Sequence, residues 1–170
     1  TAFIPNPYLE PMTLLLAVAD ELGVVYPENP NQHLLLKALT GFLIATHANG
    51  KRVVLCLDEA QAMPTESLEA LRLLTNLETE SRKLLQVVLF GQPELDVRLE
   101  EPSIRQLKQR ITFSSNLGTL NAQDVEYYLA HRLGIAGYRG ARLFARDAVR
   151  RLHRASRGVP RLVNILAHKA

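Results

Sequence analysis

The segment VVLCL, Val53–Leu57, constrains the fold most, because five consecutive apolar residues run directly into two carboxylates, Asp58 and Glu59. A continuous apolar strand is typical of a parallel sheet covered on both faces. A second run of this kind, LLQVVLF over residues 84–90, follows farther along the chain. The segments around these runs show helical spacing, so strand and helix patterns alternate. We therefore predict an α/β fold built on a parallel sheet.

Helices are predicted from their proline or Asx starts and their glycine stops. They cover residues 11–23, 33–50, 64–77, 121–134, 146–156 and 160–170, with short helical turns over 93–109. Residues 111–117, ITFSSNL, are predicted as a third strand. From Asn121 onward every predicted element is helical, and Asn121 with Asp124 resembles a capping box. We expect an α/β core over residues 1–118 and a helical cap over residues 119–170.

Charge is distributed unevenly along the chain. Residues 1–80 carry four Lys and Arg against ten Asp and Glu, whereas residues 81–170 carry sixteen against seven. From Arg139 onward nine basic residues accompany a single acid, Asp147. A patch of this kind either contacts an anionic partner or is solvated. The five histidines and Cys56 show no metal-ligand spacing, so we predict no metal cage, and Cys56 is expected to be a buried apolar residue.

Asp58 and Glu59 follow the first buried strand at the end where ligands of parallel sheets bind. One carboxylate at this position can hold Mg²⁺ directly or through its waters, and the neighbouring carboxylate can polarise an attacking water. Phosphoryl transfer needs both functions and little covalent chemistry from the protein. This is the Walker B pattern. The alternative is that the two acids cap the next helix, whose N-terminus favours negative charge.

Further polar residues follow in an order that suits nucleotide chemistry. Gln92 comes after the LLQVVLF strand, where its amide could hold the attacking water or the γ-phosphate, although a turn residue is the alternative. Arg105 and Arg110 precede the third predicted strand, and Arg161 lies in the first turn of the last helix. Arginine suits phosphate through its planar fork of donors, although each arginine alone is typical of a solvated surface.

Several strings together resemble the AAA+ ATPases. They are AFIPNPYLEPMTLLLAVADELG, VVLCLDEAQ, LLTNLETE, LLQVVLFGQPEL, LKQRI and GVPRLVN, and they cover nearly the whole chain. Within that family the likeness is to the branch of general secretion pathway protein A and of the mannose-sensitive haemagglutinin pilus biogenesis protein M (MshM). The resemblance implies a P-loop NTPase fold, with a three-layer αβα parallel sheet and a partial helical lid. It also implies binding of ATP with Mg²⁺.

The resemblance assigns a role to each residue singled out above. Asp58 is implied as the Walker B residue that binds Mg²⁺ through water, and Glu59 as the general base that activates water. Gln92 is implied as sensor 1, and Arg161 as sensor 2 in the lid. These four residues would all contact the nucleotide, its metal ion or the attacking water.

The resemblance also implies self-association into a ring, in which Arg110, or Arg105 as second choice, acts as an arginine finger on a neighbour's nucleotide. It implies an ATP-hydrolysing motor on the cytoplasmic side of the bacterial inner membrane, with type II secretion or pilus assembly proteins as partners. The alternative is a nucleic-acid-associated ATPase of the transposition or replication-initiation type, which would use the basic cap over residues 139–169. A third interpretation is a degenerate interaction scaffold, and the intact Asp58-Glu59 pair argues against it.

One family motif is not found in the sequence, the phosphate-binding loop G-x-x-x-x-G-K-[ST]. The nearest string, ATHANGKR, has Ala45 and Arg52 at two required positions and precedes a strand, whereas the loop should begin a helix. We therefore expect the sequence to begin after the first strand and the P-loop helix and to end within a lid helix. On that expectation the 170 residues alone lack ATPase activity. Without the first strand, residues 111–117 are expected to pair with LLQVVLF or with another copy of the chain.

Overall fold

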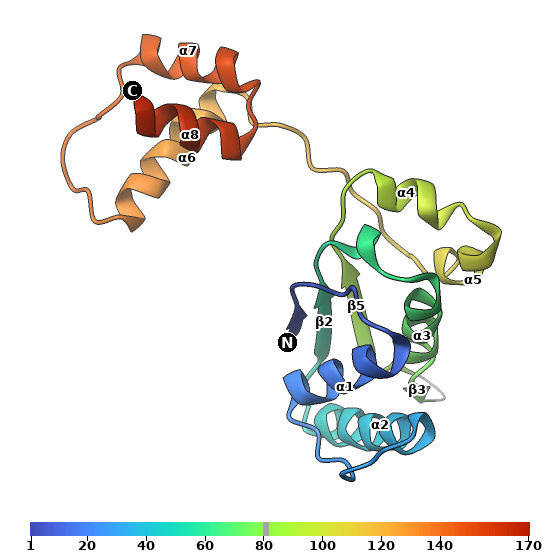
Figure 1. Ribbon diagram of the computed structural model, residues 1–170. Helices are drawn as coiled ribbons and strands as arrows, with labels where there is room; N and C mark the ends of the chain where they lie inside the picture. Colours follow the sequence, from blue (N-terminus) through green and yellow to red (C-terminus); the bar gives the residue numbers. More distant parts are fainter. Residues whose placement is uncertain (80–81) are drawn as a thin grey trace. The chain divides into compact units, whose positions relative to one another are not determined.

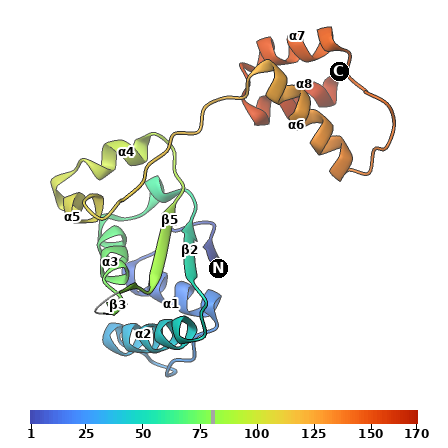
Figure 2. The same ribbon diagram turned by 180° about the vertical axis from the view of Figure 1, so that it is seen from behind.

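The computed structural model describes residues 1–79 and 82–170 of the chain (Figure 1). It consists of two compact units, unit 1 over Thr1–Phe113 and unit 2 over Ser114–Ala170. Unit 1 contains the sheet and the helices that pack on it, whereas the regular elements of unit 2 are helices (Figures 1 and 2). Each unit has its own hydrophobic core, so the two are described separately.

Unit 1 is built on three parallel strands, β1 (Ala2–Ile4), β2 (Val53–Leu57) and β5 (Leu85–Leu89), with β2 in the centre. Val53 pairs with Leu85 and Leu57 with Leu89, so β2 and β5 are in register along the whole length of both strands. Parallel strands need long crossover connections, and helices between the strands supply them. A short antiparallel pair, β3 (Glu78–Thr79) and β4 (Arg82–Lys83), precedes β5. The predicted parallel α/β fold is confirmed.

Three helices form the crossovers: α1 (Pro11–Leu22), α2 (Gln32–Ala48) and α3 (Thr65–Thr75). Pro11 lies in the first turn of α1, and Gly23 ends that helix with a left-handed φ of 70°. At the start of α2 the side chain of Asn31 accepts a hydrogen bond from the amide of Leu34 at 2.9 Å. The apolar faces of these helices bury a set of leucines, Leu14, Leu15, Leu35, Leu39, Leu43, Leu68, Leu71 and Leu74.

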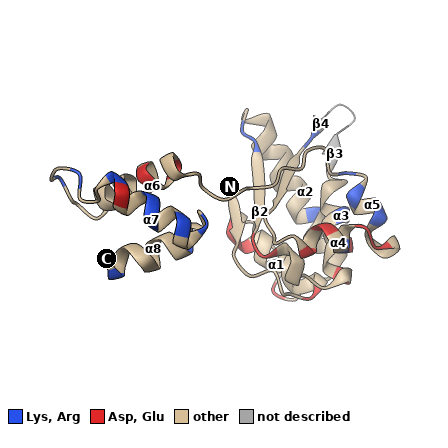
Figure 3. Ribbon diagram, turned by 90° about the horizontal axis from the view of Figure 1, so that it is seen from above, with Lys and Arg blue, Asp and Glu red and all other residues tan. Residues whose placement is uncertain are grey.

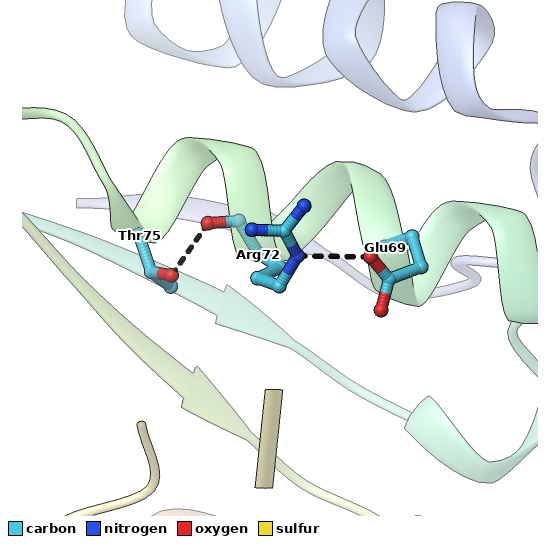
Figure 4. Close-up of polar contacts among 3 residues, drawn as sticks. All are labelled: Glu69, Arg72 and Thr75. Atoms are coloured by element: carbon cyan, nitrogen blue, oxygen red, sulfur yellow. Dashed lines mark hydrogen bonds and ion pairs between the residues drawn. The ribbon is translucent and has the colours of Figure 1, made fainter. Parts of the chain in front are cut away.

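Helix α3 carries polar contacts along its length. The buried hydroxyl of Ser67 donates to the carbonyl of Leu9, which ties α3 to the segment before α1. Farther along, Arg72 Nε donates to Glu69 Oε2 at 2.8 Å, and Thr75 Oγ1 donates to the carbonyl of Arg72 at 2.7 Å (Figure 4). An i,i+3 ion pair of this type stabilises a helix by about 0.2–0.5 kcal/mol, so these contacts support α3 without deciding its position.

The two faces of the sheet differ in burial. The face toward the helices contains the buried residues Ala2, Ile4, Val53, Leu55, Leu57 and Leu85. On the other face Phe3 is in register with Cys56, and Cys56 with Val88. Phe3 and Val88 are 48% and 38% exposed, and Cys56 is half-buried. The described residues of unit 1 therefore cover one face more completely, with Val87 and Leu89 half-buried there, and leave the other partly open.

Residues 111–117, predicted as a third strand, form no strand in the structure. Phe113 and Leu117 are 91% and 93% exposed, and the expected pairing with β5 is not found among the described residues. The preference of Ile, Thr and Phe for strands reflects their fit on a pleated, half-buried surface. The prediction was wrong because Phe113 and Leu117 of this segment are not placed on such a surface, although β5 pairs only with β2 among the described residues and has a free second edge.

After β5 the chain continues through α4 (Glu94–Leu99), a 3₁₀ turn (Pro102–Ile104) and α5 (Arg105–Lys108), as the sequence predicts. Unit 2 packs α6 (Ala122–Ile135), α7 (Arg146–Ser156) and α8 (Pro160–Lys169) around Val125, Leu129, Val149, Leu152 and Val163. The predicted capping box is present, because Asn121 Oδ1 accepts from the amide of Asp124 at 2.9 Å and the amide of Asn121 donates to Asp124 Oδ2 at 3.2 Å.

Candidate functional site

The carboxyl ends of the three strands are joined by backbone hydrogen bonds that continue beyond the sheet. The amide of Asp58 donates to the carbonyl of Ile4 at 3.0 Å, and the amide of Ala60 donates to the carbonyl of Phe90 at 2.9 Å. Because these bonds hold the segment after β2 between its two neighbours, Asp58 and Glu59 lie beside the end of β5. The sequence prediction that both acids lie at the carboxyl end of a parallel strand is confirmed, and the structure shows that this strand is the central one.

Glu59 adopts a left-handed backbone conformation, with φ 52° and ψ 37°. This region is uncommon for a residue other than glycine, and such strain costs on the order of 1–3 kcal/mol. The amide of Glu59 donates to Asp58 Oδ1 at 2.9 Å, and Gln92 Nε2 donates to Glu59 Oε2 at 3.1 Å. The predicted base and the predicted sensor 1 are therefore in direct contact, with Asp58 adjacent.

Gln61 also belongs to this cluster and was not predicted from the sequence. Its Nε2 donates to Glu59 Oε2, and its Oε1 accepts from the backbone amide of Gln92 at 3.0 Å. Gly91 leaves room for this approach, because a Cβ atom there would lie 3.1 Å from Gln61 Oε1 and 2.8 Å from Leu95 Cδ2. The only sequence signal for Gln61 is its position two residues after Glu59 in the string DEAQ.

Arg98 is the second residue that sequence reasoning missed. From α4 its Nη1 donates to the carbonyl of Gln61 at 2.7 Å and to the carbonyl of Met63, and its Nη2 lies 3.5 Å from Thr65 Oγ1. These contacts fix the 3₁₀ turn η1 (Ala60–Ala62) against the helix that follows Gln92. No spacing in the sequence could have shown this, since the contacts join segments more than thirty residues apart.

The predicted arginines lie in other places. Arg105 is the first residue of α5 and is exposed, and Arg110 follows the same helix and is half-buried. Arg161 is an exposed residue in the first turn of α8, in unit 2. The structure thus brings together Asp58, Glu59 and Gln92, and the roles of the three arginines stay predictions.

The string ATHANGKR lies away from the acids. Its first residues belong to α2, Gly50 has a left-handed φ of 70° after that helix, and Lys51 directly precedes β2. This is the amino end of β2, whereas Asp58 follows its carboxyl end. The interpretation of Gly50 as a helix stop is therefore confirmed, and Lys51 does not lie at the end of β2 that carries Asp58 and Glu59.

The carboxylate oxygens of Asp58 and Glu59, at the carboxyl end of β2, are ligands of the kind that Mg²⁺ prefers. Neither Asp58 nor Glu59 pairs with a basic side chain among the described residues, so their oxygens are not neutralised there. The described part of the chain contains no group of three or more His, Cys, Asp or Glu that could hold a metal ion by itself. Two carboxylates without a third protein ligand fit an ion that keeps several waters and takes its other ligands from phosphates.

Comparison with known proteins agrees with this geometry. Residues 2–99 match the family model described as AAA domain. General secretion pathway protein A of Aeromonas hydrophila is 46% identical to the chain over 169 residues. That match covers 99% of the chain and 31% of the relative, so the chain spans less than a third of that protein. The resemblance to AAA+ proteins and to general secretion pathway protein A is confirmed, and the chain belongs to the AAA domain family.

Solved structures with the same fold are more distant in sequence. The ADP form of the ORC2 protein of Aeropyrum pernix aligns with a TM-score of 0.59 and 17% identity, over 79% of this chain and 36% of that one. CDC6P of Pyrobaculum aerophilum aligns with a TM-score of 0.60 and 16% identity, over 89% of this chain and 40% of that one. At this identity the likeness shows the fold alone. In the described part of the chain, no helix combines the length and apolar character needed to cross a membrane.

Proposed function

We propose that this chain carries the hydrolytic residues of an AAA+ ATPase that drives assembly of a bacterial envelope system. The observation that carries the proposal is the hydrogen bond between Gln92 and Glu59, 3.1 Å long, with Asp58 next to it at the carboxyl ends of adjacent parallel strands. Open α/β sheets bind their ligands at this edge. The position supports a role in nucleotide hydrolysis better than the alternative of a helix cap, because Glu59 makes no side-chain capping contact with η1.

Each residue of the cluster has a separate part in the proposed reaction. Glu59 accepts a proton from the water that attacks the terminal phosphate, and Gln92 helps to hold that water or the phosphate. Asp58 would hold Mg²⁺ through water, and the ion, when bound, neutralises charge on the phosphates. We assign Arg161 as sensor 2, and Arg110, or else Arg105, as the arginine finger that acts on a neighbouring copy in a ring.

Among envelope systems we favour type II secretion over pilus biogenesis. The support for this choice is the relative named general secretion pathway protein A, which matches 99% of the chain. The proposal places the site on the cytoplasmic side of the inner membrane, where ATP is available. Secretion or pilus assembly proteins would be the partners, and copies of the same chain would form the ring.

The decisive experiment measures ATP turnover by a protein that carries these residues together with their natural flanking sequence. Glu59→Gln should lower kcat by about 10²–10⁴-fold, the range for loss of a general base, while nucleotide binding is retained. Glu28→Gln is the matched control, because Glu28 is an exposed loop residue. Unchanged turnover in Glu59→Gln would remove Glu59 from the base role.

The 170-residue chain alone should neither bind nor hydrolyse ATP, because the phosphate-binding motif is not in its sequence. Titration with a fluorescent ATP analogue checks this expectation. Saturable binding that ATP displaces would show that other backbone groups of the chain hold the phosphates.

A nucleic-acid-associated role is the second candidate, and the charge of unit 2 is the observation that favours it. Each of its three acids is already engaged: Asp124 in the capping box, Glu126 with Arg142, and Asp147 with Arg150. Eight basic residues, all exposed, therefore have no carboxylate partner within unit 2: Arg132, Arg139, Arg146, Arg151, Arg154, Arg157, Arg161 and Lys169. Arginine-rich surfaces suit phosphates because the guanidinium offers several donors in one plane.

Binding of the chain to duplex DNA as a function of salt tests this candidate. A triple change of Arg146, Arg151 and Arg154 to Gln should reduce the slope of log K against log salt by about 2.7, at 0.9 per lost phosphate contact. Gln in place of Lys37, Arg52 and Arg105, three exposed residues of unit 1, is the matched control. Equal slopes for the two variants, or no salt-dependent binding at all, would exclude this role for unit 2.

A further inference from the structure

We infer that Gln61 is a positioning residue that fixes the carboxylate of Glu59, an inference that rests on the proposed ATPase function of the site. Gln61 Nε2 and Gln92 Nε2 both donate to the same oxygen, Glu59 Oε2. Among the described residues Oε1 of that carboxylate accepts no hydrogen bond. Two amides thus hold one oxygen and leave the other available to accept a proton from water, which is the arrangement that a general base requires.

Gln61 also joins the base to the sensor. Its Oε1 accepts from the backbone amide of Gln92 at 3.0 Å, while its Nε2 contacts Glu59. One side chain therefore uses both ends of its amide, one on the base and one on the backbone of the residue that supplies the second donor. If the loop after β5 moves, the side-chain amides of Gln61 and Gln92 should move together. Gln61 therefore keeps Glu59 and Gln92 in a fixed position relative to each other.

The backbone of Gln61 is itself held in place. Arg98 donates to the carbonyls on either side of Ala62, those of Gln61 and Met63, and Met63 and Ala60 are both buried. The turn that carries Gln61 is therefore held by the packing of Ala60 and Met63 and by hydrogen bonds from the guanidinium of Arg98 in α4. Anchoring of this kind lets a side chain act as a fixed support, because residues on firmly packed elements position a site better than residues on free loops.

Stability alone does not account for these contacts. Glu59 and Gln92 are exposed and Gln61 is only half-buried, so removal of the Gln61 amide leaves no buried core group without a partner. A neutral hydrogen bond contributes about 0.5–1.5 kcal/mol to folding at most sites. In catalysis, by contrast, displacement of a reacting group by about 1 Å can lower the rate on the order of a hundredfold.

The test is steady-state ATP hydrolysis by the protein with its natural flanking sequence. Gln61→Ala should lower kcat about tenfold to a hundredfold and leave KM for ATP within about twofold, because only orientation of the base is lost. Gln61→Glu should lower kcat at least as much, since it removes the donor and places a like charge beside Glu59. Gln106→Ala, at an exposed position of α5, is the matched control and should behave as wild type.

A double variant separates positioning from a structural role. If Gln61 acts through Glu59, the Glu59→Gln/Gln61→Ala protein should turn over ATP no more slowly than Glu59→Gln alone. Additive losses, or a fall in kcat that tracks a fall in Tm, would overturn the inference. Wild-type kcat in Gln61→Ala, with turnover lost in Glu59→Gln, would overturn it and leave the proposed function standing. Absence of turnover in the wild-type protein would instead reject the proposed function.

The contact can also be tested in the 170-residue chain without nucleotide. We expect Glu59→Ala to shift the side-chain amide resonances of Gln61 and Gln92 and to speed their hydrogen exchange. The amides of Gln106 and Gln123, which do not contact Glu59, should stay unchanged and serve as internal controls. Unaltered signals from Gln61 and Gln92 would overturn the geometry on which the inference depends.

Discussion

Unit 1 and unit 2 are held together by different means. Unit 1 buries many leucines between three helices and one face of a parallel sheet, whereas unit 2 closes three helices around five buried residues. Both units contain local helix-end contacts, the Asn31 cap and the Gly23 stop in unit 1 and the capping box at Asn121 in unit 2, where Gly158 also approaches Leu120 closely. The difference in core size teaches that loss of one local contact should matter more in unit 2, because a small core gains less from apolar burial.

The units also differ in charge. Unit 1 contains ten Lys and Arg against fourteen Asp and Glu, a net charge of −4, and unit 2 contains ten against three, a net charge of +7. Arginines are prominent along α7, and the acids concentrate on unit 1 (Figure 3). The predicted acids of catalysis thus belong to the unit with net negative charge, and the net positive charge belongs to the other. Four stability and titration predictions test how far the two units depend on different interactions.

The largest effect should come from Leu71→Ala, which removes a fully buried side chain of α3. A cavity of this kind costs about 2–5 kcal/mol of unfolding free energy. Denaturant unfolding with hydrogen exchange should show weaker protection in unit 1 and unchanged protection in α6, α7 and α8. Leu34→Ala, at a residue 39% exposed on α2, is the matched control. Equal loss of protection in both units would show that they unfold as one.

Gly158→Ala should be the next largest effect, and it should be confined to unit 2. Gly158 has a φ of 74°, and a Cβ atom there would lie 2.0 Å from the carbonyl oxygen of Leu120. The backbone conformation alone costs about 1–3 kcal/mol for another residue, before the clash is added. The amide of Leu120 also donates to the carbonyl of Gly158 at 2.9 Å, so the start of α6 should lose protection. Gly118→Ala, with no atom within 4 Å, is the control.

A smaller effect is expected from Asn121→Ala, which removes the N-cap of α6. Loss of such a cap costs about 0.5–2 kcal/mol, because two amides at the helix start lose their acceptor. Thermal unfolding followed by circular dichroism checks the size of the effect, with Asn116→Ala in the segment before α6 as control. A change no larger than that of the control would show that the core of unit 2 suffices without the cap.

The smallest effect concerns a surface contact of unit 1. Tyr26 donates its hydroxyl hydrogen to Asp20 Oδ1 at 2.6 Å, and this hydrogen bond raises the pKa of Tyr26 above its ordinary value of 10.0. The contact is therefore present at neutral pH and is lost as pH rises through the raised pKa. Asp20→Asn should lower the pKa toward its ordinary value, which the phenolate absorbance measures. An unchanged titration would remove Asp20 as the cause.

The sequence predicted most elements of the fold. Proline and Asx starts and glycine stops lay close to the observed helix ends, since such signals act within one turn of a helix. The two apolar runs gave β2 and β5 because each is continuous and bounded. The short strand β1 pairs with β2, whereas residues 111–117 form no strand although the second edge of β5 is free. Pairing between segments so far apart in the chain is not encoded in a local pattern.

The candidate site was predicted in part. Asp58, Glu59 and Gln92 could be found because they directly follow the strands that the apolar runs define. Gln61 gave only the weak signal of the string DEAQ, and Arg98 gave none. Their contacts form where α4 packs against the turn after β2. No local sequence pattern encodes this packing between distant segments.

By itself the sequence determined which residues end the buried strands, where most helices begin and end, and which part of the chain carries the positive charge. These properties depend on neighbours within a few residues. Only the tertiary structure decided that one face of the sheet is covered, that Ile111–Leu117 stays unpaired, and that Gln61 and Arg98 hold Glu59 beside Gln92. Contacts between distant segments are chosen by the packing of whole elements, and therefore they cannot be read from local order along the chain.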